Sequence, residues 1–385
     1  MQLEPVYLDY AATAPLDPAA AAAVAVGQGL YGNPSSDHEA GRVAAEALGA
    51  ARASVARLLG VAAAEVVLTS GGSEADTTAL WGTFAARRFS GHLVTTSIEH
   101  SAVLENARAL AELGVEVTFL DPEPSGHVDP ADVAAAMRPD TVLVSVMHAN
   151  NETGAIQPVE AIAGIAGAAG VAFHTDAVHT AGKIDLTAVG ATMISVSAHK
   201  FGGPRGIGAL SVRAGHRIAP LIRGGSQENG LRAGTENLAA AMGMAAAAEA
   251  CLDRITPDYR RSMRTLRDRL VAGLAEVGGV EANVTGPVVD ETVSLRFRGI
   301  RGDTLADTLD LHGIYVSTGS ACHAGDETVS HVLTAQGLSE HEARSAVRFS
   351  LGPGVDSADV DRVVAVTASA VGRLRRMAGV VGADR

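Results

Sequence analysis

The chain has 385 residues, a length that suits about two domains. Its formal net charge of −13 gives no general electrostatic reason to bind nucleic acid or an anionic membrane, so we expect neither partner. The two cysteines, Cys251 and Cys322, form no disulfide framework and fit a reducing compartment. We find no signal peptide and no apolar run long enough to span a bilayer, and therefore expect a cytoplasmic protein.

Short apolar runs alternate with helical stretches through the first part of the chain. We expect strands at 65–70, 92–96, 115–120, 141–147, 171–175 and 193–197, with helices such as 74–89, 102–113 and 158–169 between them. This alternation is typical of βαβ units and of a mostly parallel sheet covered on both faces. We interpret 206–212 as an antiparallel return strand.

The pattern changes near residue 239. Helices are expected at 239–254 and 259–277, followed by strands at 293–297 and 315–317, a helix at 303–311 and two further helices. We therefore place a domain boundary near 250–258. The predicted large domain spans 16–252, and the predicted small α+β domain combines 1–15 with 253–385.

Lys200 ends a β-rich run and is surrounded by small residues and glycines. Such a lysine can point into a cleft, where desolvation and a nearby cation lower the amine pKa as a Schiff-base lysine requires. A lysine taken at random is more often a solvated surface residue. Lys183 and Lys200 are the only lysines of the chain, which favours a special role for Lys200 only a little.

Asp176 follows an expected strand, at the sheet edge where open α/β folds bind ligands. A buried carboxylate there can keep the ring nitrogen of pyridoxal phosphate (PLP) protonated. The alternative is an aspartate that caps a following helix. The turn that contains Gly72 and Ser73 leads from a strand into a helix and offers backbone N–H groups to a phosphate, although such turns are often ordinary caps.

Further candidates follow other expected strands. His100 can stack on a cofactor ring and move protons, or be purely structural. Asn151 can hydrogen-bond the cofactor or a substrate carboxylate, or belong to a plain turn. Cys322 lies in a polar Gly/Ser-rich stretch where a reactive thiol is plausible, whereas Cys251 lies in an apolar helix and indicates packing. Arg348 alternates with apolar residues and can hold a carboxylate or form a salt bridge.

Together these motifs resemble the cysteine desulfurases, PLP enzymes of aminotransferase fold type I, class V. The resemblance runs nearly end to end, through YLDYAATAPLDP, TSGGSEAD, EHSAVLE, HANNETG, HTDAVHTAGK and SAHKFGG to RAGTEN, STGSACHAG and VRFSLG. The last three are the most specific to the desulfurases. The segment around Cys322 resembles the branch that has a long catalytic loop. The implied fold is α/β, with a mostly parallel seven-stranded sheet in the large domain.

The resemblance also implies roles for individual residues. Lys200 would carry PLP as a Schiff base, Asp176 would pair with the pyridinium, and His100 would stack on the ring. The implied substrate is L-cysteine, with Cys322 as the nucleophile that takes its sulfur, releases L-alanine and passes the sulfur to an acceptor protein. No metal site is expected. The remaining implied ligands are Gly72, Ser73, Ser197 and His199 for phosphate, Thr235 for the phosphate of a neighbouring subunit in a homodimer, and Asn151 and Arg348 for the substrate carboxylate.

Three positions depart from the usual desulfurase pattern. His179 stands near the expected cofactor oxygen where glutamine is usual, and a histidine there can titrate. Thr77 replaces an asparagine, and Ala14 replaces a threonine. These departures indicate a divergent member with a specialised pathway. The alternatives are a selenocysteine lyase or another PLP-dependent C–S lyase and, from a different class, a low-turnover sulfur-relay or scaffold protein.

Overall fold

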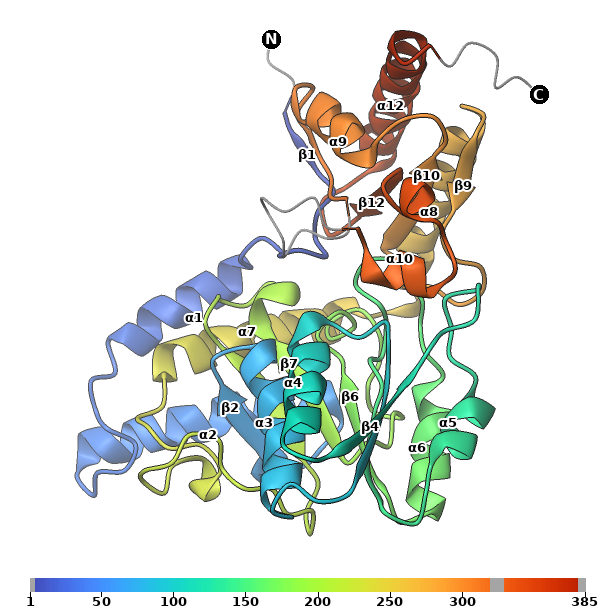
Figure 1. Ribbon diagram of the computed structural model, residues 1–385. Coiled ribbons are helices and arrows are strands. Elements are labelled where there is room, and N and C mark those ends of the chain that lie inside the picture. The colour runs from blue at the N-terminus through green and yellow to red at the C-terminus, as the bar shows by residue number, and fades with distance from the viewer. Residues whose placement is uncertain (1–3, 319–328, 380–385) are drawn as a thin grey trace.

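The computed structural model describes residues 4–318 and 329–379, and its lower part in Figure 1 is built around a large sheet. The strand order is β2-β8-β7-β6-β5-β3-β4. Strand β8 is antiparallel to β2 and β7, and the other neighbouring pairs are parallel. The expected seven-stranded, mostly parallel sheet and its return strand are therefore confirmed. The strands are β2 (Val66–Thr69), β3 (His92–Thr96), β4 (Glu116–Leu120), β5 (Thr141–Ser145), β6 (Ala172–Asp176), β7 (Met193–Ser197) and β8 (Gly208–Val212).

Apolar clusters on both faces explain why these runs form a central sheet. Strands β2, β3, β5, β7 and β8 are buried along their whole length, as expected for strands covered by helices on both sides. One cluster includes Ala79 and Leu110, which come from α3 (Gly72–Ala85) and α4 (Ser101–Glu112). The other includes residues of α2 (Glu39–Leu59), α6 (Val159–Ala168) and α7 (Leu238–Arg254), while α5 (Pro130–Ala136) lies beside α6 in Figure 1.

Helices α1 (Pro18–Gln28) and α2 pack against α7, and the sequence analysis assigned no element to this N-terminal region. The faces of α1 differ little in hydrophobicity because the helix is mostly alanine, so its helical period is weak. Helix α2 is amphipathic, with Leu48, Ala51 and Val55 buried at helical spacing, and the sequence analysis missed this pattern. A Cβ at Gly27 would lie 2.6 Å from the Cα of Ala239. Glycine at this position therefore allows α1 and α7 to approach closely.

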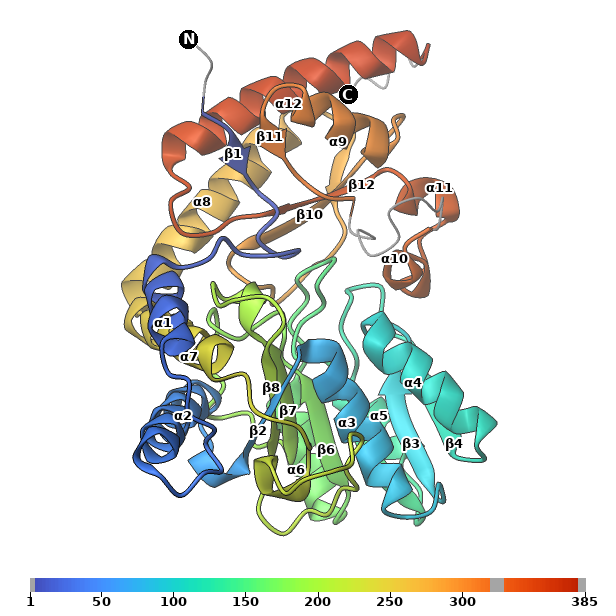
Figure 2. The same ribbon diagram turned by 90° about the vertical axis from the view of Figure 1, so that its left-hand side faces the viewer.

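The elements in the upper part of Figure 1 share a separate apolar cluster, which includes Leu270, Phe297 and Phe349. An antiparallel sheet of order β12-β10-β9 packs with helices α8, α9 and α12, and Figure 2 shows α12 lying across the top of the molecule. A separate parallel pair joins β1 to β11. The elements of this part are β1 (Val6–Tyr7), α8 (Pro257–Ala275), β9 (Val280–Ala282), β10 (Thr292–Phe297), α9 (Gly302–Asp310), β11 (Ile314–Tyr315), α10 (His331–Ala335), α11 (Glu340–Ala343), β12 (Ala346–Ser350) and α12 (Ser357–Met377).

The break between α7 and α8 at Ile255 and Thr256 lies within the predicted boundary at 250–258. The division into 16–252 and 1–15 with 253–385 stays a prediction. After β11 we expected two helices, and the described residues 329–379 contain three, because the short α10 and α11 precede the long α12. Within the described ranges, no helix combines the length and apolarity that crossing a membrane requires.

Candidate active site

A cavity of about 260 Å³ lies where β6 and β7 end and α3 begins. The carboxyl edge of an open parallel sheet is the usual place for a ligand, because loops of several strands converge there. Nine of the residues predicted from the sequence line this cavity. They are Gly72, Ser73, His100, Asn151, Asp176, His179, Ser197, His199 and Lys200.

Lys200 ends a short 3-10 turn, Ala198–Lys200, that directly follows β7. Its Nζ donates hydrogen bonds to the carbonyl oxygens of Ala11 (2.7 Å) and Ala12 (3.0 Å). The lysine is therefore partly buried and held by the N-terminal segment, in contrast to the solvated surface lysine of the alternative interpretation. Ala11 and Ala12 were not predicted as site residues, since only the folded chain brings this segment beside Lys200.

Asp176 is the last residue of β6, and only 5% of it is exposed. Its Oδ1 accepts a hydrogen bond from the Val178 N–H at 2.8 Å. Burial raises the pKa of the carboxyl, while the charges of His100 and Lys200 act in the opposite direction. A buried carboxylate in this setting favours a cationic N–H group as its partner.

A second buried carboxyl, Asp76, also lines the cavity and was missed in the sequence analysis. Burial and the nearby charge of Asp176 hold the pKa of Asp76 well above its usual value. Its Oδ1 lies 3.6 Å from Nε2 of His174, whose ring nitrogens are each 2.9 Å from the hydroxyls of Ser145 and Ser195. Burial lowers the pKa of His174 to about 3, so this histidine stays neutral. The sequence signal that could have identified Asp76 is an acidic residue on the apolar face of a predicted helix.

Gly72 and Ser73 form the first turn of α3, whose free N–H groups favour an anion. A Cβ at Gly72 would lie 2.7 Å from Cγ2 of Val178, so glycine keeps this part of the cavity open. Ser197 lies across from this turn, 3.5 Å from the same hypothetical Cβ.

Nδ1 of His199 is 3.1 Å from Oγ1 of Thr13. Burial together with the charge of Lys200 lowers the pKa of His199 to about 4.

His100 caps helix α4, since its Nδ1 accepts a hydrogen bond from the Ala102 N–H at 3.1 Å. This bond fixes the plane of an imidazole that also faces the cavity, so the structural and functional interpretations are compatible. Asn150 and Asn151 have different roles. The buried Asn150 accepts N–H groups of the following turn, whereas Asn151 lines the cavity.

His179 is 3% exposed, and its Nε2 lies 3.2 Å from Oγ1 of Thr292. Its buried Nδ1 has no hydrogen-bond partner in the part of the chain that the structure describes. Burial lowers the pKa of His179 well below its usual value. The expectation that this histidine titrates is therefore corrected, because desolvation keeps the imidazole neutral.

Two predicted residues that the structure describes, Arg348 and Thr235, do not line the cavity. Arg348 lies in β12, is 3% exposed and donates from Nη1 to the carbonyl oxygen of Asn151 (2.7 Å) and from Nη2 to Oδ1 of Asp9 (2.7 Å). It is thus next to the cavity, with Asp9 as an unpredicted partner. Thr235 is exposed, and Cys322 lies outside the described residues.

The fold and the cavity together define an α/β enzyme whose reactive groups gather at the carboxyl edge of a parallel sheet. The sequence profile of the family described as Aminotransferase class-V matches residues 6–363. The IscS-like cysteine desulfurase of Mycobacterium tuberculosis is 43% identical over 392 residues, which cover 98% of this chain and 100% of that protein.

Solved structures of similar proteins also align with nearly the whole chain. A NifS-like protein aligns with a TM-score of 0.89 at 35% identity, over 96% of this chain and 100% of that chain. SspA in complex with cysteine aligns with a TM-score of 0.80 at 35% identity, over 90% of this chain and 99% of that chain. The chain therefore belongs to the class V aminotransferase family and, within it, to the cysteine desulfurases.

Proposed function

We propose that the cavity holds PLP, with Lys200 as its covalent anchor. The observation that carries this proposal is the convergence of Lys200 and Asp176 on one cavity. Asp176 would face the ring nitrogen, His100 the ring, and His179 and Asn151 the phenolic oxygen. Gly72, Ser73, Ser197 and His199 would bind the phosphate. The unpartnered Nδ1 of His179 and the space kept open by Gly72 fit a polar group of this size.

The proposed reaction converts L-cysteine into L-alanine and leaves a persulfide on Cys322. When bound, PLP withdraws electrons from an attached amino acid and labilises the bonds at Cα and Cβ. The Lys200 amine takes the Cα proton, and buried Asp176 keeps a proton at the ring nitrogen. The Cys322 thiolate attacks the substrate sulfur and the Cβ–S bond breaks, so the sulfur stays on Cys322 as a persulfide. The bond's electron pair remains with the carbon product, which takes up a proton at Cβ and regains one at Cα before it leaves as alanine.

Arg348 and Asn151 are proposed to hold the substrate carboxylate. Arg348 already donates to the Asn151 carbonyl oxygen, and its buried Nε has no partner among the described residues. An arginine with an unpaired N–H beside the cavity suits a carboxylate, whose two oxygens accept charge-assisted hydrogen bonds. The cysteine bound in the SspA structure supports a substrate of this class.

The proposed partners are an acceptor protein for the persulfide sulfur and a second copy of the chain. Thr235 is exposed and belongs to the segment 231–237, away from the cavity of its own chain. This position supports its assignment to the phosphate of a neighbouring subunit in a homodimer. A cytoplasmic location stays a prediction.

The test uses the purified full-length protein. Its visible spectrum should show a bound PLP chromophore, and Lys200→Ala should lose the PLP that borohydride reduction fixes covalently to the wild-type chain. Addition of L-cysteine with a thiol reductant should yield alanine and sulfide in equal amounts. A colourless protein, or a coloured protein that releases neither product, would contradict the proposal. Faster turnover of L-selenocysteine with little sulfide release would favour a selenocysteine lyase.

A further inference from the structure

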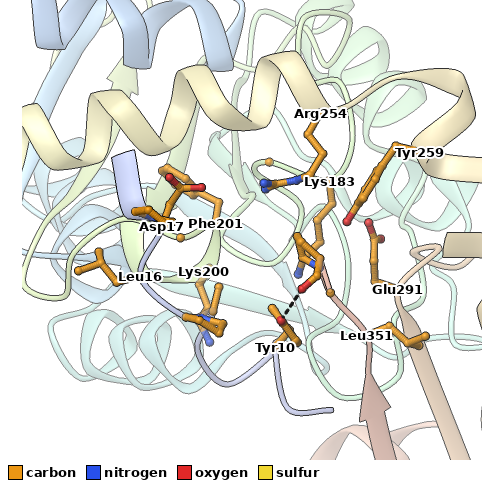
Figure 3. Close-up of a pocket in the computed structure, with 17 residues that line it drawn as sticks. Tyr10, Leu16, Asp17, Lys183, Lys200, Phe201, Arg254, Tyr259, Glu291 and Leu351 are labelled. Carbon is orange, nitrogen blue, oxygen red and sulfur yellow. Dashed lines mark hydrogen bonds between the residues drawn. The ribbon is translucent and has the colours of Figure 1, made fainter. Parts of the chain in front are cut away.

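A second cavity of about 200 Å³ adjoins the candidate active site at Lys200. Lys200 lines both cavities, and this one, the rear cavity, is bounded by Lys183, Arg254, Tyr259 and Glu291 (Figure 3). Its volume is several times the roughly 30 Å³ of one liquid water, so it can hold a small organic molecule.

Glu291 carries the first part of the inference. It is 3% exposed and lines the rear cavity. Its carboxyl accepts a hydrogen bond from its own backbone N–H, and the charge of Lys183 acts on it, but no described residue forms an ion pair with it. The preceding residue, Asp290, shows the opposite situation, with ion pairs to Arg260 (3.3 Å), Arg264 (2.9 Å) and Arg267 (3.6 Å). Burial raises the pKa of Glu291, so its ionised form is incompletely compensated and the position favours a further cation or donor from outside the chain.

The positively charged groups of the rear cavity also have N–H donors that the described residues leave without acceptors. Among the described residues, Lys183 donates one hydrogen bond, from Nζ to the His179 carbonyl oxygen at 2.8 Å, and the charge of Glu291 acts on it. Arg254 donates to the sulfur of Cys251 at 3.1 Å, but its buried Nε has no partner in the described chain. Burial lowers the pKa of Lys183 to about 8, which still leaves the amine mostly protonated near neutral pH.

Charges of both signs line the rear cavity, and the charges of Lys183 and Glu291 act on each other. In Figure 3, Arg254 and Tyr259 enter from the upper helices, and the Glu291 carboxylate points toward the Tyr259 hydroxyl. Asp17 adds a second carboxylate at the rim, where it also caps α1 through the Ala19 N–H. Two cations and two carboxylates favour a ligand that carries both signs of charge and no net charge.

We propose that the rear cavity is a second binding site, and that it takes a small zwitterionic α-amino acid. Its carboxylate would pair with Arg254 and Lys183, and its ammonium with Glu291. A molecule bound there lies against Lys200 and couples the amino-acid concentration to the active site. The choice of an amino acid rests partly on the proposed function, whose substrate and product are both small amino acids, while the charge pattern is independent of it.

The test measures binding of radiolabelled L-alanine by equilibrium dialysis to holoenzyme whose PLP has been fixed on Lys200 by borohydride. We expect one alanine per chain at saturation. Propionate, which lacks the ammonium, should bind roughly tenfold or more weakly, the effect of one charge-assisted hydrogen bond. Glu291→Gln should lower alanine affinity to that of propionate, and Arg254→Gln should weaken both ligands.

Two control variants show whether the measured alanine binding comes from the rear cavity. Arg348→Lys, which alters the active-site side, should retain the alanine site. Asp290→Asn, which removes the neighbouring ion pairs and keeps Glu291, should also retain it. The proposal is overturned if the treated enzyme binds no alanine, if propionate binds equally well, or if Glu291→Gln changes nothing while Arg348→Lys abolishes binding. Failure of the proposed function would appear separately, as no alanine released from L-cysteine by the untreated enzyme.

Discussion

Arg348 and Asp9 form an ion pair with 2.7 Å between Nη2 and Oδ1, which ties strand β12 to the N-terminal segment. The arginine side chain is 3% exposed and the aspartate side chain 20%. The same guanidinium donates to the carbonyl oxygen of Asn151 at the edge of the candidate active site. The pair therefore orients an arginine that we propose to bind the substrate carboxylate.

Arg348→Lys should raise KM for L-cysteine by about 10- to 100-fold, because a single ammonium lacks the planar fork with which a guanidinium can reach Asp9, Asn151 and a carboxylate. The control is Asp9→Asn, which keeps an acceptor oxygen and the guanidinium. It should lower the free energy of unfolding by about 1–3 kcal/mol with a much smaller rise in KM. Steady-state kinetics and urea denaturation separate the two effects. Equal KM values for the two variants would remove Arg348 from the substrate site.

Cys322→Ser should leave the visible PLP spectrum in place and abolish persulfide formation, since a hydroxyl is a far weaker nucleophile toward sulfur than a thiolate. The matched control is Cys251→Ser. Cys251 is buried in α7, where its thiol donates to the Phe201 carbonyl oxygen at 3.3 Å, and burial raises the thiol pKa. That variant should keep sulfur transfer. Labelling of the persulfide followed by mass spectrometry gives the readout, and a persulfide retained in Cys322→Ser would refute the assignment.

The neighbours Asn150 and Asn151 should respond differently to alanine. Asn150 bonds the Ile98 carbonyl oxygen at 2.9 Å and accepts the N–H groups of Glu152 and Thr153. Its loss should cost about 2–4 kcal/mol of stability, because several buried groups lose partners. Asn151→Ala should change stability little and raise KM for L-cysteine or weaken PLP retention. Thermal unfolding and kinetics measure both, and a reversed pattern would mean that Asn151 is structural.

The sheet could be predicted from the sequence because its strands are short continuous apolar runs, such as 141–147 and 193–197, bounded by helical patterns. Helix α1 could not, since its alanine-rich faces give little contrast. Helix α2 could have been predicted from the helical spacing of Leu48, Ala51 and Val55, which the sequence analysis missed. Lys200 and Asp176 could be placed at strand ends, and parallel strands carry their carboxyl ends to one edge of the sheet.

The remaining site features depend on tertiary contacts. Ala11 and Ala12 reach Lys200 only because the N-terminal segment crosses the sheet edge. The neutral state of His179 follows from its burial, which a local pattern does not report. Asp76 was visible as an acid on an apolar helix face, but its closeness to Asp176 was not.

His174 should make stability depend on pH. Burial lowers its pKa from 6.5 to about 3, so between these values the unfolded chain binds a proton that the native imidazole does not. This contribution therefore destabilises the native state as pH falls. Going from about pH 7 to about pH 4.5 should cost roughly 2–3 kcal/mol, at about 1.4 kcal/mol per pH unit below the unfolded pKa.

His174→Asn removes this titration, so the stability advantage of the wild type over the variant should shrink by that amount at the lower pH. Urea denaturation at both pH values measures it. Ser145→Ala is the matched control, because it removes one hydrogen bond of His174 and no ionisable group. The loss of stability caused by Ser145→Ala should change far less with pH. A wild-type advantage over His174→Asn that stays constant or grows on acidification would mean that the native imidazole accepts its proton at a higher pH than its burial implies.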